Sequence, residues 1–136
     1  MFNNALPSNV VKRKVLIVED NEINREILKE TLEDDYDVIE AVNGEEGLNI
    51  LSQYYKDISL ILLDVVMPVC DGFEFLSRQK SDSLLASVPV IVTTGNNSQE
   101  DELKCLGLGA VDFITKPYNV RIVKSRIDSV IKLRES

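Results

Sequence analysis

Histidine is absent from this chain of 136 residues. Its absence excludes Ser-His-Asp and Cys-His nucleophiles, as well as zinc sites that use imidazole ligands. Cysteine is scarce, since Cys70 and Cys105 are the only two and they form no CxxC pair. This spacing indicates free thiols in a reducing cytoplasm rather than a disulfide framework or a thiolate zinc site.

Long apolar runs and an excess of basic residues are also missing. No run approaches the roughly 20 apolar residues that span a bilayer, and residues 1–11 lack the apolar core of a secretory signal. We therefore expect a cytoplasmic protein without membrane contact. Lys and Arg number 15 against 23 Asp and Glu, a net charge of −8. This balance argues against direct binding of nucleic acid through its phosphates.

Short apolar runs alternate with longer amphipathic stretches along the whole chain. Strands are expected at 15–18, 36–42, 58–63, 88–92 and 110–114. Helices are expected at 21–33, after Asn43-Gly44 through Leu48 and Leu51, at 72–80, at 98–106 with Ser98 as N-cap, and at 119–133. The alternation predicts one α/β domain, a doubly wound parallel sheet of five strands flanked by five helices.

Polar residues stand where the apolar runs end. Glu19 and Asp20 follow the first run, Asp64 the third, Thr94 the fourth and Lys116 the fifth. The carboxyl ends of parallel strands face the same edge of a sheet, and ligands bind there. The sequence therefore predicts one cleft that contains three carboxylates, a hydroxyl and a lysine.

Three neighbouring carboxylates need a partner. Two like charges ~4 Å apart repel by about 4 kcal/mol at an effective dielectric near 20, and a shared proton or a bound cation relieves this. An oxygen-only site with few protein ligands favours Mg²⁺ over Ca²⁺. A metal beside a lysine and a hydroxyl suits phosphoryl transfer. Asp64 is a candidate nucleophile, since aspartyl phosphates are known intermediates.

Four motifs carry a resemblance to a known family. They are VLIVEDN at 15–21, LLDVVMPVCDG at 62–72, PVIVTTG at 89–95 and GAVDFITKP at 109–117. In this order and spacing they resemble the receiver domain of bacterial two-component response regulators, the CheY-like family. The resemblance covers about 14–133 and implies a flavodoxin-like sheet of order 2-1-3-4-5. We expect residues 1–13 to be an N-terminal extension and 14–134 the receiver domain, with no output domain in this chain.

The resemblance also implies a phosphoacceptor and its metal. Asp64 would accept a phosphoryl group from a phosphohistidine on a sensor histidine kinase or phosphotransfer protein. Mg²⁺ would be the cofactor, held by Asp20 directly, by Glu19 through water, by Asp64 and by the backbone carbonyl of Val66. The protein would catalyse only its own phosphorylation and dephosphorylation, so it is expected to be a signalling domain rather than an enzyme.

Three further residues would convert phosphorylation into a signal. Lys116 would pair with the phosphoryl oxygens, Thr94 would swing to bond them, and Phe113 matches the family's rotating aromatic. The resemblance places the signalling face on helix four, strand five and helix five, where a homodimer would also form. The last helix is basic and has no stop signal. It is either a solvated face or continues into an output domain or a dimer partner in a longer gene product.

Three positions depart from the commoner residues of the family, and they are Glu19, Gly95 and Val66. Glu19 replaces Asp and has a longer arm, while Gly95 replaces Ala after the switch threonine. Val66 offers no side chain that orients an attacking water, which predicts slow self-dephosphorylation.

Three other functions are alternatives to a phosphorylated signalling domain. A haloacid-dehalogenase-like phosphatase needs a second Asp where Val66 stands, and a dinucleotide-binding fold needs a G-x-G-x-x-G motif after the first strand. Neither is present. A receiver-like interaction module that works without phosphorylation remains the alternative.

Overall fold

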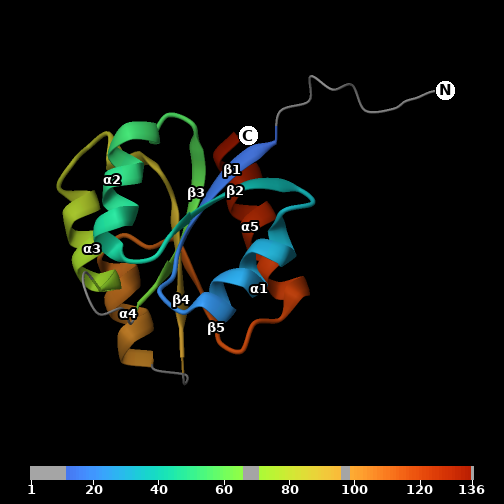
Figure 1. Cartoon of the computed structure of the whole chain (residues 1–136). Coiled ribbons are helices and arrows are strands. Elements are labelled where there is room, and N and C mark those ends of the chain that lie inside the picture. Colours follow the sequence, from blue (N-terminus) through green and yellow to red (C-terminus); the bar gives the residue numbers. More distant parts are fainter. Residues whose placement is uncertain (1–11, 66–70, 96–98, 136) are drawn as a thin grey trace.

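The sheet of the computed structural model, which describes residues 12–65, 71–95 and 99–135, has five parallel strands in the order β2-β1-β3-β4-β5 (Figure 1). All four neighbouring pairs are parallel. The predicted doubly wound sheet and its strand order are confirmed. The strands are β1 (Arg13–Val18), β2 (Tyr36–Ala41), β3 (Ile58–Asp64), β4 (Val90–Thr94) and β5 (Asp112–Thr115).

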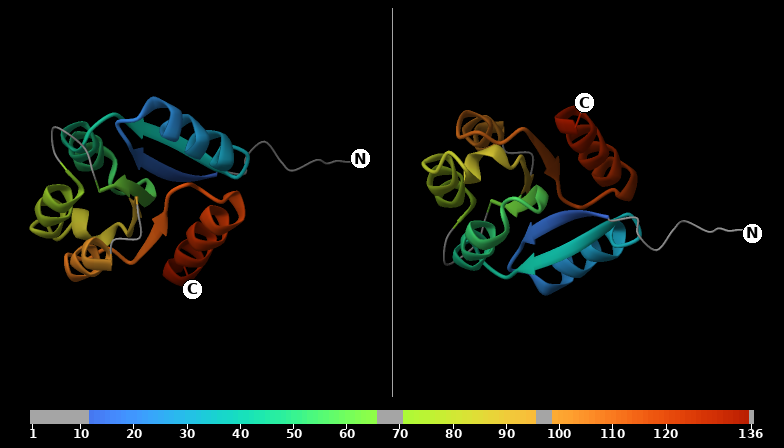
Figure 2. Two further views of the ribbon diagram at one scale, coloured as in Figure 1. Left: turned by 90° about the horizontal axis from the view of Figure 1, so that it is seen from below. Right: turned by 90° about the horizontal axis from the view of Figure 1, so that it is seen from above.

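Helices cover both faces of this sheet, α1 and α5 on one face and α2, α3 and α4 on the other (Figure 2). No helix in the described ranges is long and apolar enough to cross a membrane. The helices are α1 (Glu22–Leu32), α2 (Gly44–Tyr54), α3 (Gly72–Lys80), α4 (Gln99–Gly107) and α5 (Val120–Glu135), with a short 3₁₀ helix η1 (Leu85–Ser87) before β4.

Strand side chains alternate between two apolar layers. The layer under α2, α3 and α4 contains Leu16, Val18, Ile61, Leu63 and Phe75. The layer under α1 and α5 contains Val15, Ile17, Leu60, Leu62 and Ile127. Because both faces of the sheet are buried, its central strands are continuous apolar runs rather than alternating ones, which made them recognisable in the sequence.

Side-chain caps fix where the strands turn into helices beside the predicted site. In each of α1, α2 and α3 the residue before the helix accepts a hydrogen bond from a backbone N–H in the first turn, and these residues are Asn21, Asn43 and Asp71. Such a cap contributes about 1 kcal/mol. Asn21 and Asp71 cap the helices that follow β1 and β3, the strands expected to present the carboxylates.

Two predicted strands are shifted along the chain. The fourth, expected at 88–92, runs from Val90 to Thr94, because η1 occupies the preceding residues and Pro89 has no N–H to donate to a ladder. The fifth, expected at 110–114, runs from Asp112 to Thr115. The turn before it contains Gly109 with φ 108°, a left-handed conformation that suits glycine.

Smaller predictions have mixed outcomes. β1 begins at Arg13, which pairs with Tyr36, one residue before the expected domain start. Cys105 is a free, buried thiol. Cys70 and the expected N-cap Ser98 lie outside the described residues.

Candidate functional site

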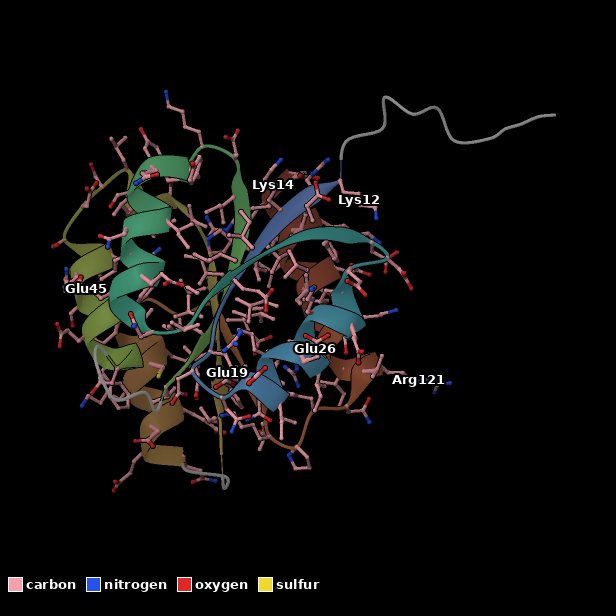
Figure 3. The ribbon with its side chains drawn as sticks, in the orientation of Figure 1. Lys12, Lys14, Glu19, Glu26, Glu45 and Arg121 are labelled. Atoms are coloured by element: carbon pink, nitrogen blue, oxygen red, sulfur yellow. The ribbon has the colours of Figure 1, made fainter. Side chains whose placement is uncertain are left out.

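The carboxyl ends of β1 and β3 bring three carboxylates together. Glu19 and Asp20 follow β1, and Asp64 is the last residue of β3; one carboxylate oxygen from each lies within 4.8 Å of the others. Glu19 is 1% exposed and Asp64 4%, whereas Asp20 is exposed. Figure 3 shows Glu19 where β1 ends, beside the start of α1. Two carboxylates are thus buried in a cluster that opens to solvent at Asp20.

Lys116 lies against the two buried carboxylates. Its Nζ donates to Oδ1 of Asp64 at 3.1 Å and stands 3.6 Å from Oε1 of Glu19. Its backbone N–H donates to the carbonyl of Thr94 at 2.7 Å, which ties the end of β5 to the end of β4. The lysine that the sequence predicts at the end of the fifth strand therefore contacts the carboxylates at the ends of the first and third strands.

The buried position of Glu19 raises its proton affinity. Burial raises the pKa of Glu19 to about 7, and the neighbouring Asp64 carboxylate adds to the rise. The backbone N–H of Asn21 and the charge of Lys116 act in the opposite direction. One lysine therefore does not fully balance these carboxylates, and a cation of higher charge would favour their ionised form.

Thr94 contributes a hydroxyl that has no internal partner. Its side chain is 3% exposed, and Oγ1 makes no hydrogen bond within the part of the chain that the structure describes. The preceding residue, Thr93, is in register with Asp64, so Thr94 lies just beyond the phosphoacceptor candidate on the adjacent strand. A buried polar group without a partner is uncommon in a native fold. A ligand with oxygen atoms at this edge of the sheet would give the hydroxyl a partner.

The start of α3 fixes the backbone that carries Asp64. The N–H of Gly72 donates to the carbonyl of Val65 at 2.9 Å. A Cβ at Gly72 would lie 2.7 Å from Cα of Val65 and 2.9 Å from the carbonyl oxygen of Asp64. Only glycine allows this approach, so α3 holds the end of β3 in place.

Two residues of the site were missed in the sequence. The hydroxyl of Tyr118 donates to Oε1 of Glu19 at 3.2 Å, and Nη1 of Arg25 donates to the backbone carbonyl of Glu19 at 2.9 Å. Burial is the main cause that raises the pKa of Tyr118, so its hydroxyl keeps its proton at neutral pH. The feature of the sequence that could have pointed to Tyr118 is its position two residues after Lys116.

The other predicted residues lie apart from the carboxylates. Phe113 is half-buried on β5, in register with Val92, and packs against the apolar layer under α2, α3 and α4. Gly95 follows β4 and is exposed. Val66, the expected carbonyl ligand, lies outside the described residues.

Comparisons with known proteins identify the family. The model of one family, the response regulator receiver domain, matches residues 15–128. The chain belongs to this family. The receiver domain superposes on the chemotaxis protein CheY4 of Vibrio cholerae with a TM-score of 0.81 and 30% sequence identity, covering 88% of this chain and 99% of that one. The predicted family is therefore confirmed.

Curated relatives of this receiver domain are longer proteins. It is 36% identical over 123 residues to the response regulator GtcR of Aneurinibacillus migulanus, covering 90% of this chain and 49% of that protein. It is also 36% identical over 122 residues to a probable cyclic di-GMP phosphodiesterase of Vibrio cholerae, covering 90% of this chain and 27% of that protein. The chain thus spans half or less of the length of these relatives. Its family is one of signalling domains from two-component systems.

Proposed function

We propose that this receiver domain is a phosphorylation switch in which Asp64 accepts a phosphoryl group from the phosphohistidine of a sensor histidine kinase or phosphotransfer protein. The contact between Lys116 and Asp64, inside a cluster of three carboxylates, is the observation that carries the proposal. In the reaction, a carboxylate oxygen of Asp64 bonds to phosphorus as the bond from phosphorus to the histidine nitrogen breaks. Lys116 then stands beside the oxygens of the transferred group.

The donor set of the cluster fits Mg²⁺. Three carboxylates without nitrogen or sulfur ligands are typical of a hard cation, and the exposed Asp20 leaves an open side for water. Asp20, Glu19 and Asp64 would hold the ion, together with the carbonyl of Val66 as the expected backbone ligand. When bound, Mg²⁺ supplies positive charge to the phosphoryl oxygens.

Thr94 and Phe113 would convert the phosphorylated state into a conformational signal. The buried hydroxyl of Thr94 lacks a partner and would donate to a phosphoryl oxygen on Asp64. Because the carbonyl of Thr94 already bonds the N–H of Lys116, its movement would act on the end of β5. Phe113 on the same strand would rotate with it, and the change would reach the face formed by α4, β5 and α5.

That face carries exposed apolar side chains, among them Leu103 and Leu106 on α4 and Ile122 on α5. They support its assignment as the signalling surface and as the site of a homodimer. Since the curated relatives are longer, an output domain in the full-length protein would receive the signal. We further propose a cytoplasmic location, where a kinase and Mg²⁺ are both available.

The phosphoryl group is proposed to leave slowly, because Val66 has no polar side chain that orients an attacking water. We expect the phosphoryl group to remain on Asp64 for minutes or longer at 25 °C when no phosphatase is present. Decay of a radiolabel on the purified protein measures this directly. Loss of the label within seconds would contradict the assignment to Val66.

Labelling with a small phosphodonor tests the switch itself. With acetyl phosphate and Mg²⁺ the wild type should become labelled, and EDTA should prevent it. Asp64→Asn should abolish labelling, whereas Asp57→Asn, a matched change at an exposed aspartate after α2, should not alter it. An unlabelled wild type would favour the alternative, a receiver-like interaction module that works without phosphorylation.

A further inference from the structure

The Glu19 carboxylate is held at both of its oxygens. Oε1 accepts the hydroxyl of Tyr118 at 3.2 Å, and Oε2 accepts the backbone N–H of Asn21 at 3.2 Å. The two donors come from opposite ends of the domain's sequence, since Asn21 caps α1 and Tyr118 lies between β5 and α5. Glu19 is thus held by the N-cap residue of α1 and by the connection between β5 and α5, which also contains Lys116.

A glutamate needs this restraint more than an aspartate would. Its side chain has one additional rotatable bond, and ordering such a bond costs conformational entropy. The Glu19 side chain is also nearly inaccessible to solvent, so a carboxylate turned away from its donors would lose hydrogen bonds that water does not replace. A fixed donor on Oε1 selects one orientation of the longer arm.

The Tyr118 hydroxyl also affects how Lys116 divides its charge. Nζ of Lys116 lies closer to Asp64, at 3.1 Å, than to Glu19, at 3.6 Å. Both Lys116 and Tyr118 approach Oε1 of Glu19. Without the hydroxyl, Oε1 would lose a donor and attract Lys116 more strongly, which would draw the lysine away from the phosphoacceptor.

We propose that Tyr118 is a positioning residue, whose hydroxyl holds Glu19 in the orientation that binds Mg²⁺ and leaves Lys116 to Asp64. The proposal rests on the function proposed above and deepens it. The ring of Tyr118 packs against the apolar layer under α1 and α5. Tyr118→Phe therefore keeps the packing and removes only the hydroxyl, which makes the role testable.

Mg²⁺ affinity, measured by calorimetry on the unphosphorylated full chain, tests this role without any phosphodonor. Tyr118→Phe is expected to weaken the binding about tenfold, the size typical of a residue that orients a metal ligand. Tyr54→Phe, at a half-exposed tyrosine on α2, is the matched control and should leave the affinity unchanged. Equal affinity in Tyr118→Phe and wild type would overturn the proposal.

A double-mutant cycle shows whether the hydroxyl acts through Glu19. Glu19→Asp withdraws the carboxylate by one methylene from Tyr118, so Tyr118→Phe should change the Mg²⁺ affinity less than twofold in that background. A tenfold loss in both backgrounds would mean that the hydroxyl acts independently of Glu19, and would contradict the proposal.

The failure of this inference is distinguishable from failure of the switch. Labelling of Asp64 without coupling between Tyr118 and Glu19 would overturn the positioning role alone. Coupling in Mg²⁺ affinity without labelling of Asp64 would support the positioning role and overturn the switch. A wild type that binds no Mg²⁺ would overturn both.

Discussion

Gly72 shows how one missing side chain positions the phosphoacceptor candidate. Its absent Cβ is what allows the first turn of α3 to touch the backbone of Asp64 and Val65. The atoms that a side chain would meet are backbone atoms of β3 and its end, which cannot rotate out of the way. The site therefore depends on a glycine that has no functional group of its own.

Gly72→Ala should lower the free energy of unfolding by about 1–3 kcal/mol, because the added methyl group forces α3 and β3 apart. Gly107→Ala is the matched control at the last residue of α4, where no atom lies within 4 Å of the added Cβ. It should be neutral or stabilise by up to about 1 kcal/mol. Urea denaturation of both variants measures the difference, and equal stabilities would contradict the steric argument.

The connection from α3 to β4 depends on one buried amide. Nε2 of Gln79 donates to the carbonyl of Leu85 at 2.8 Å and to that of Val88 at 2.9 Å. The Leu85 carbonyl lies in η1 and also accepts the backbone N–H of Val88 at 3.2 Å, while the Val88 carbonyl lies just after η1. A single side chain thus fixes the path into β4, the strand that ends in Thr94.

Gln79→Met should cost about 1–3 kcal/mol of unfolding free energy, since it keeps the side-chain length but removes the donor to the Val88 carbonyl and one of the two donors to the Leu85 carbonyl, which keeps the N–H of Val88. Gln53→Met on the exposed face of α2 is the matched control and should stay within about 0.5 kcal/mol of wild type. Thermal or urea denaturation distinguishes them. A loss at Gln79 no larger than at Gln53 would show that the two bonds contribute little.

The elements that the sequence predicts well are those whose pattern repeats. Strands buried on both faces are continuous apolar runs, and a parallel sheet brings the residues at their carboxyl ends together, as for Asp64 and Lys116. The path of η1 has no such repeat, because it depends on where Gln79 points. The contact between Tyr118 and Glu19 joins residues 99 positions apart. It depends on the course of the connection between β5 and α5, which no periodicity encodes.

For the molecule as a whole, the net charge of −8 matters most where it is buried. Most acidic residues are exposed, and exposed charges are screened by water and salt. Glu19 and Asp64 are not, since both are buried beside each other. The stability of the Mg²⁺-free domain should therefore depend on pH through this pocket in particular.

The direction in which stability changes with pH follows from the pKa of Glu19, which is about 7 in the folded chain against an ordinary value of 4.5. The folded state retains a proton that the unfolded state releases, so the stabilising effect is complete below pH 4.5 and is lost as pH rises to about 7. In EDTA, the free energy of unfolding of the wild type should fall by about 2–3 kcal/mol more than that of Glu19→Gln between pH 4.5 and pH 8.

Saturating Mg²⁺ should restore stability at pH 8 in the wild type, because the ion binds the ionised carboxylates of the native state. Urea denaturation at each pH, with and without Mg²⁺, measures both effects. Parallel pH profiles for wild type and Glu19→Gln in EDTA would contradict this prediction, since they would mean that the ionised Glu19 carboxylate does not destabilise the folded state.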